Sequence, residues 1–380
     1  MSGRQLSGTR AVLGWFIATA AVLAAAPGWA QFDRLRDDIE LKGLDMHPRG
    51  SLLEPREPWM AAVRPRDAVL YGLLDVGLAR TLASARTPCR PKQEASSGIE
   101  NLSASHWGVR TRETLGGGWR AYLRLEQSIA VDTGGVGNDC AAFDRAALVG
   151  LWHRRLGAFS VGLQEQPASQ AALLGDPWEG ATRVWPGELA YLCSRRVVAG
   201  GGVGDAPSRL CLGRRSDRAI AWRSPEAAAL PGLRVEALGT LTGGAEQSGF
   251  SLRYEQGLLA VALGHQRWSA DDAVTPLSLR LNAGAWVGYA ALSSGRAAGD
   301  RFQQIALGAA YTVQHHPWDR WRVAIGEHRW AAGGSAARAA MGWERGLSRR
   351  TAVHAEFSLP AGGSANGHAV GVGIRHGFTL

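Results

Sequence analysis

The stretch Ser105–Gln127, SHWGVRTRETLGGGWRAYLRLEQ, constrains the fold most, because charged and apolar residues alternate along it with a period of two. One side of the pattern is polar or charged and comprises His106, Arg110, Arg112, Arg120, Tyr122, Arg124 and Glu126. The other side carries apolar residues such as Trp107, Val109, Leu123 and Leu125. The glycines at 116–118 predict a turn between two strands that are apolar on one face and charged on the other. A soluble sandwich with its charged face in bulk water would also satisfy this stretch alone.

The same alternation recurs to the end of the chain and predicts sixteen strands. They are Ala68–Arg80, Ser105–Glu113, Trp119–Ser128, Asp144–Leu151, Ala158–Gln164, Arg218–Ser224, Leu233–Leu241, Gly249–Gln256, Leu258–Trp268, Leu277–Gly284, Trp286–Ser293, Phe302–Val313, Arg320–Trp330, Ala337–Arg345, Thr351–Ser358 and His368–Phe378. Long connections, such as Thr81–Ala104 and Glu165–Asp217, alternate with short ones, such as Thr114–Gly118. Short turns at one end and long loops at the other are typical of an outer-membrane β-barrel.

The cost of placing arginine in lipid decides which face points inward. An arginine that faces the middle of a bilayer costs about 2–4 kcal/mol. Turning Arg110, Arg112, Arg120 and Arg124 outward together would therefore consume the stability of a whole domain. These residues must face the interior, which must be wet because unpaired buried charges are too costly. Tryptophans near strand ends (Trp119, Trp152, Trp268 and Trp330) are interpreted as aromatic girdles at the two membrane interfaces.

The N-terminus has the pattern of a secretory signal peptide over residues 1–30. Arg4 and Arg10 precede the apolar run Ala11–Ala26, and small residues follow at Gly28-Trp29-Ala30. An uncleaved membrane anchor is the alternative. Cleavage would remove two arginines and no acid, which takes the net charge from +9 to +9 − 2 = +7. Residues 31–67 are charged and lack alternation, so we interpret them as a loosely ordered periplasmic extension, with a small plug or partner-binding segment as the alternative.

Four cysteines fit an exported protein in an oxidising compartment. Cys193 and Cys211 flank a glycine-rich segment, which favours a bridge between them and leaves Cys89 and Cys140 as the second pair. The sequence does not choose among the three possible connectivities. The spacing of the cysteines suits no zinc site, and no metal or other cofactor is expected.

Several stretches, taken in order, resemble the Gram-negative trimeric porins, most closely those of β-proteobacteria. They are LYGLLDVGL at 70–78, SHWGVR at 105–110, ETLGGGWRAYLRLEQ at 113–127, DRAALVGL at 144–151, LGAFSVG at 156–162, RAIAWRSP at 218–225 and VGVGIRHGF at 370–378. The resemblance covers nearly all of Ala68–Leu380. It implies an all-β fold: a sixteen-stranded transmembrane antiparallel β-barrel at residues 68–380, assembled as a homotrimer in the outer membrane of a Gram-negative bacterium, with its third external loop folded into the lumen.

The resemblance also implies a pore constriction between a basic wall and an acidic third loop. The family's wall positions correspond to His106, Arg145 and Arg215, with Arg110, Arg112 and Arg124 expected nearby, and its acidic loop positions correspond to Asp176 and Glu179. An ordinary lumen charge paired with a neighbouring acid is the alternative for each arginine. Three features depart from the family. His106 and Leu163 stand where basic residues are usual, and the chain ends Phe378-Thr379-Leu380 instead of on an aromatic residue, which leaves its effect on assembly open.

A passive channel for small hydrophilic solutes and ions, with a preference for anions, is the function these patterns favour. A channel biased toward one class of anionic solutes is the second hypothesis. A barrel enzyme is disfavoured, because the ten histidines are scattered and no nucleophile, base and orienting group converge. A nucleic-acid partner is disfavoured by the signal peptide and by the lack of a basic stripe separate from the strands.

Overall fold

The computed structural model describes residues 68–80, 97–103, 105–136, 141–180, 215–225, 230–240, 247–297, 299–360 and 368–379, all within the compact unit Asp45–Leu380. The predicted signal peptide, the extension at 31–67, the four cysteines and Leu380 lie outside the described residues. Among the described residues, no helix has the length and apolar character needed to cross a bilayer.

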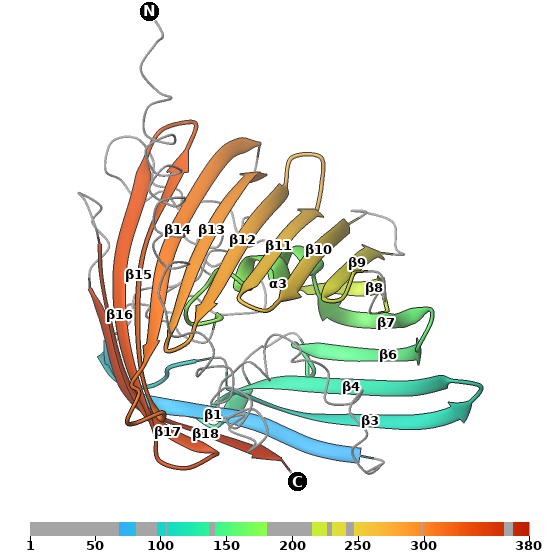
Figure 1. Ribbon diagram of the computed structural model, residues 1–380, viewed down its shortest axis with the longest axis horizontal. Helices are drawn as coiled ribbons and strands as arrows, with labels where there is room; N and C mark the ends of the chain where they lie inside the picture. The colour runs from blue at the N-terminus through green and yellow to red at the C-terminus, as the bar shows by residue number, and fades with distance from the viewer. Residues whose placement is uncertain are drawn as a thin grey trace, which may run out of the picture. The chain divides into compact units, whose positions relative to one another are not determined.

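Sixteen antiparallel strands form one continuous wall that closes on itself (Figure 1). They are β1 (Ala68–Arg80), β3 (His106–Gly116), β4 (Trp119–Ala130), β6 (Ala146–His153), β7 (Gly157–Glu165), β8 (Arg215–Arg223), β9 (Leu233–Thr240), β10 (Ser248–Gln256), β11 (Leu259–Arg267), β12 (Ala273–Ala283), β13 (Trp286–Ala297), β14 (Asp300–Thr312), β15 (Asp319–Trp330), β16 (Ser335–Gly346), β17 (Thr351–Pro360) and β18 (Ala369–Thr379). Strand β1 pairs with β18 on one side and β3 on the other, which closes the barrel. All sixteen predicted strands are confirmed, with ends shifted by a few residues.

Two short strands lie between wall strands. Strand β2 (Ser97–Asn101) precedes β3 and pairs with the same edge of β1, and β5 (Gly135–Val136) pairs with the end of β4. Both were missed in the sequence, since neither is long enough to show a period of two.

The two faces of the wall differ as the alternation predicts. Outward side chains are apolar and exposed, as at Leu277 (43% exposed) and Ile325 (53%). Inward neighbours are polar and buried, as at Arg280 (7%) and Arg322 (4%). The inward orientation predicted for the charged face is therefore confirmed.

The two ends of the barrel differ in their connections, and we call them the turn end and the loop end. The turn end has short connections such as 117–118, 154–156 and 284–285, whereas the loop end carries the connections 81–105 and 166–214. Later loop-end connections are also short, at 268–272, 298–299 and 331–334. Long loops are thus concentrated beside the N-terminal strands, and the rim over β11–β16 is low.

The predicted aromatic girdle was wrong for three of its four tryptophans. The Trp152 ring lies beneath the Arg120 guanidinium on the inner face, 4.9 Å from ring centroid to Cζ. Trp268 and Trp330 pack against the buried cluster that includes Phe302. Parity along the strand, and not nearness to a strand end, decides which face a residue occupies.

The outward aromatic residues at the turn end come from other positions. Trp286 packs against Tyr311 with ring centroids 4.5 Å apart, and Trp321 lies 6.4 Å from Trp343. Such a band suits the interface between lipid and water.

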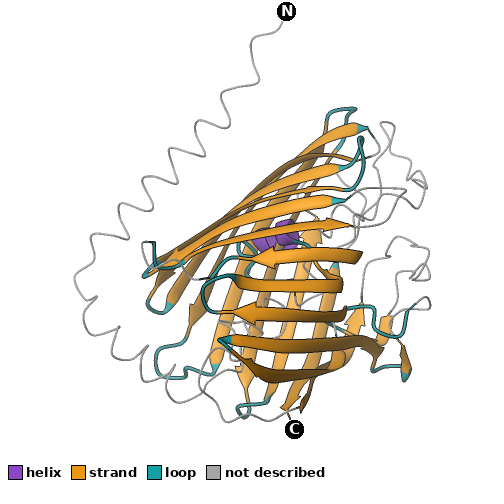
Figure 2. Ribbon diagram, turned by 90° about the vertical axis from the view of Figure 1, so that its right-hand side faces the viewer, coloured by secondary structure: helices purple, strands orange, loops and turns teal. Residues whose placement is uncertain are grey.

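Helix α3 (Pro167–Leu173) follows β7 and is enclosed by the strands (Figure 2). Pro167 stands in the first turn, where its missing N–H costs nothing, and alanines follow. We call residues 166–180 the inner segment. It packs on small inward residues of the wall: a Cβ built on Gly264 would lie 2.7 Å from Cα of Ala168, and one on Gly308 would lie 2.3 Å from Cγ of Pro177. Small side chains on the wall thus make room for this segment.

A substitution at Gly308 tests this packing. Gly308→Val should lower the free energy of unfolding by about 1–3 kcal/mol, because a rigid proline ring and a strand carbonyl oxygen leave no room for the new side chain. Gly288→Val is the matched control, since the nearest atom to its built Cβ is 4.0 Å away. Urea unfolding in phospholipid vesicles measures both; equal midpoints for the two variants would contradict the packing described.

Candidate channel lining

The predicted basic wall is organised around one buried carboxylate, Glu126 on β4. Its Oε1 lies 3.3 Å from Nε2 of His106 and 3.9 Å from Nε of Arg145, and its Oε2 accepts a 2.9 Å hydrogen bond from Nη2 of Arg124. His106 is fully buried and Glu126 is 2% exposed. Strands β3 and β4, with the residue that precedes β6, therefore bring these three predicted residues together.

The other three wall residues lie beside this cluster. Arg110 is directly opposite Arg124 in the β3–β4 register, and its guanidinium lies 5.4 Å from the centroid of the Tyr71 ring. Arg112 is opposite Tyr122 on the same face. Arg215 begins β8 and acts electrostatically on Glu126. All six predicted wall residues thus lie around the inner face of β3, β4 and β6 or at the adjoining start of β8.

The predicted acidic residues lie in the last turn of the inner segment. Asp176 is buried, and its carboxylate accepts hydrogen bonds from the backbone N–H of Trp178 (2.9 Å) and Gly180 (2.8 Å). The carboxylate thus stabilises the turn at residues 176–180. Glu179 is also buried, adopts a left-handed backbone (φ 53°), and its Oε2 has no hydrogen-bond partner among the described residues.

The end of the inner segment, at Trp178, crosses the wall far from the basic cluster. Trp178 packs against inward alanines of β13 to β16. In the strand order of the closed barrel, these strands are about half the circumference away from β3, β4 and β6. Beyond Gly180, the connection to β8 lies outside the described residues, so its path stays a prediction.

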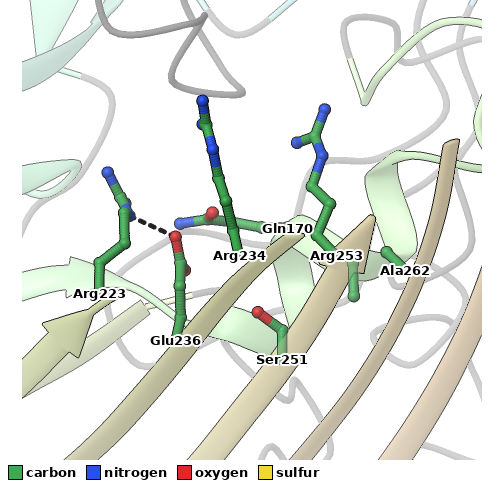
Figure 3. Close-up of a pocket in the computed structure, with 8 residues that line it drawn as sticks. Gln170, Arg223, Arg234, Glu236, Ser251, Arg253 and Ala262 are labelled. Atoms are coloured by element: carbon green, nitrogen blue, oxygen red, sulfur yellow. Dashed lines mark hydrogen bonds and ion pairs between the residues drawn. The ribbon is translucent and has the colours of Figure 1, made fainter. Parts of the chain in front are cut away.

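A second basic set was missed in the sequence, and we call it the β8–β10 arginines: Arg223, Arg234 and Arg253. Their guanidinium groups project side by side into the same open space, next to Gln170 of α3 (Figure 3). Arg223 pairs with Glu236, and Arg253 lies 2.8 Å from Glu255. Within the described part of the chain, Arg234 has no hydrogen bond or ion pair, and it stands directly opposite Arg253 in the sheet. Like charges directly opposite destabilise a strand pair, so this arrangement favours an anion nearby.

A third charged set lies at the junction of β1 and β18, and we call it the seam network. Asp75 accepts from Nε of Arg375 (2.9 Å) and lies 2.8 Å from Nε2 of His354. Glu344 bridges Arg375 (2.8 Å) and Arg322 (3.3 Å). Because each carboxylate is shared, this network contributes little unbalanced charge to the lumen.

The alternation itself could have found the β8–β10 arginines. Arg234 and Glu236 occupy alternate positions on a strand whose other face carries Leu233, Val235 and Ala237. The sequence prediction placed these strands correctly but took its candidate residues from the family resemblance, which points to the N-terminal strands.

Comparison with known families decides the identity. Residues 18–359 match the family model described as Gram-negative porin. The chain is a Gram-negative porin. The match begins inside the predicted signal peptide, so the boundaries at residues 30 and 67 stay predictions.

Solved structures with the same fold have low sequence identity to this porin. An anion-selective porin from Comamonas acidovorans has a TM-score of 0.64 and 22% identity over 82% of this chain and 99% of its own. OmpF of Salmonella typhi, in a complex with daunomycin, has a TM-score of 0.58 and 13% identity over 82% and 97%. OmpT of Vibrio cholerae, solved in a trimer form, has a TM-score of 0.57 and 14% identity over 82% and 100%. No curated protein is similar enough in sequence to give a match.

Family and fold together place this porin in the outer membrane, where it forms a passive channel. Lipid surrounds the apolar outer face of such a barrel, and the polar inner face lines the water-filled path.

Removing the carboxylate at the centre of the basic wall should destabilise the barrel. Glu126→Gln leaves His106, Arg124 and Arg145 without their shared partner, and we expect a loss of about 3 kcal/mol in the free energy of unfolding. Glu327→Gln is the control, since its partner Arg329 is exposed and the pair contributes about 0–1 kcal/mol. Urea unfolding in vesicles compares them; a loss at Glu126 no larger than that at Glu327 would refute its central role.

Proposed function

We propose that this porin conducts small hydrophilic solutes and ions with a preference for anions. The observation that carries the proposal is the imbalance at the basic wall, where five arginines (Arg110, Arg112, Arg124, Arg145 and Arg215) lie near three carboxylates (Glu126, Asp144 and Glu165). Cationic side chains that line a water-filled path lower the energy of an anion and raise that of a cation. The β8–β10 arginines add a second cationic region on the same inner face.

The inner segment is proposed to narrow the path from the side opposite the basic wall. Glu179 is the better candidate for the acidic partner across the neck, because the carboxylate of Asp176 is committed to its own turn. Opposed charges across a narrow neck produce a transverse field in which polar solutes align, whereas apolar solutes lose water contacts.

A homotrimer is proposed as the assembled state. The trimer form of the Vibrio OmpT structure supports it, since that protein shares the fold. The outward apolar face, with its aromatic residues at the turn end, fits a barrel surrounded by outer-membrane lipid.

Ion selectivity tests the proposed anion preference. A unit charge about 7 Å away in water lowers the energy of an anion by about 0.6 kcal/mol, close to thermal energy, and raises that of a cation by the same amount, so loss of one arginine should lower the anion-to-cation permeability ratio by roughly a factor of 7. Reversal potentials in planar bilayers under a salt gradient should show at least this decrease for the double variants Arg145→Ala/Arg215→Ala and Arg234→Gln/Arg253→Gln. Arg345→Gln, whose outward side chain pairs with Asp319, should leave the ratio unchanged.

A comparison of the two double variants shows which arginines determine the ion selectivity. An effect of the first pair alone places selectivity at the basic wall, and an effect of the second alone places it at the β8–β10 arginines. Cation preference in the unsubstituted porin would overturn the proposal.

A channel biased toward polyvalent anions is a second candidate, favoured by the opposition of Arg234 and Arg253 without an acid between them. Citrate should then block chloride current in a concentration-dependent way, and Arg234→Gln should weaken the block. Citrate that leaves single-channel current unchanged would support the non-specific channel.

A further inference from the structure

A row of arginines faces outward at the loop end of the barrel. The strand registers place Arg267 of β11 opposite Ala273 of β12, Ala273 opposite Arg296 of β13, and Arg296 opposite Arg301 of β14. Three of the four residues in this cross-strand row are therefore arginine, and we call them the arginine row. All three are exposed, whereas their chain neighbours Gln266, Ala297 and Phe302 are buried on the inner face.

The arginine row has no internal partner for its charge. Within the described residues, none of its three guanidinium groups makes a hydrogen bond or an ion pair. Arg296 and Arg301 are directly opposite, an arrangement of like charges that destabilises the pair. Arg329 on neighbouring β15 is different, since Glu327 binds it through two hydrogen bonds of 2.7 and 2.6 Å. The positive charge of the arginine row is thus not neutralised by a neighbouring acid among the described residues, whereas on β15 Glu327 neutralises Arg329.

Residues below the row grade from polar to apolar. The next outward row toward the turn end is polar, without arginine, lysine or carboxylate, and comprises His265, Thr275, Ser294 and Gln303. The row after that is apolar and comprises Leu263, Leu277, Leu292 and Ile305. This order matches the passage from water through headgroups to hydrocarbon.

The height of the row agrees with this order. On β13, Trp286 marks the turn-end interface, and Arg296 lies 296 − 286 = 10 residues further along. Ten residues span about 34 Å along a strand, or about 26 Å along the membrane normal at a tilt of about 40°. The apolar band of such barrels is about 25 Å tall, so the row stands at its upper boundary, where an outward arginine costs about 0–1 kcal/mol.

We propose that the arginine row binds the phosphate groups of anionic lipid headgroups in the external leaflet. The loop end faces outward in outer-membrane barrels. A guanidinium group matches phosphate through paired hydrogen bonds, and two such groups one strand apart suit the oxygens of one headgroup. The short connections 268–272 and 298–299 keep the rim low beside the row. The row points away from the lumen, so a lipid and not a permeating solute is its occupant.

Native mass spectrometry of the full porin in neutral detergent tests this, with phosphatidic acid as the probe and phosphatidylcholine of the same chains as the uncharged reference. Each arginine near a membrane surface contributes about fivefold to binding of an anionic lipid. Arg267→Gln/Arg296→Gln/Arg301→Gln should therefore bind phosphatidic acid on the order of a hundredfold more weakly. Binding of phosphatidylcholine should not change.

The matched control is Arg223→Gln/Arg234→Gln/Arg253→Gln, which removes the same charge from the lumen. It should keep the preference for phosphatidic acid, and millimolar inorganic phosphate should not displace the lipid. The proposal is overturned if the row variant keeps its preference, if both variants lose it equally, or if inorganic phosphate competes as a free ligand. Because the row is exposed, the barrel of the row variant should fold, and circular dichroism checks the fold of both variants.

Discussion

The seam between β1 and β18 is the interaction on which the rest of this structure depends. In lipid every backbone N–H and C=O needs a partner within the protein, and a sheet meets that demand only when it closes. The β1–β18 register runs from Tyr71 opposite Thr379 to Arg80 opposite Val370. Asp75, His354 and Arg375 join the two edges from the inside. Closure fixes which residues face inward, and every later consequence for charge follows from that parity.

The two halves of the inner wall differ in the side chains that they present to the interior. On β11 to β16, small residues such as Gly264, Gly308 and Gly342 meet the inner segment closely. On β3, β4 and β6, long basic side chains extend from the wall instead. The inner segment is therefore packed on one half of the wall and the basic cluster lies on the other, although Arg280 and Arg322 also face inward on the first half.

Most of the fold could be predicted from the sequence, because lipid on one side and water on the other impose a local period of two on every strand. The site could be predicted only in part. His106, Arg124 and Arg145 meet at Glu126, but the role of Asp176 depends on hydrogen bonds within its own turn, which no period reveals. Trp152 and Trp330 were misassigned because nearness to a strand end was weighed above parity. The opposition of Arg234 to Arg253 required the register between strands, which the sequence of either strand does not contain.

The consequence of an arginine side chain therefore depends on which face of the strand it occupies and on its level between the turn end and the loop end. Arg234 faces water in the lumen, where its charge attracts permeating anions, whereas Arg296 faces outward at the edge of the apolar band. An arginine at Leu292, on the same face but four residues closer to the turn end, would lie in hydrocarbon and cost about 2–4 kcal/mol. Outward arginines are thus restricted to the two edges of the apolar band, as at Arg296 and Arg345, while inward ones are tolerated along the whole water-filled path. The formal charge of +9 sums over both populations, so ion preference follows from the inward arginines left unbalanced by acids and not from the total.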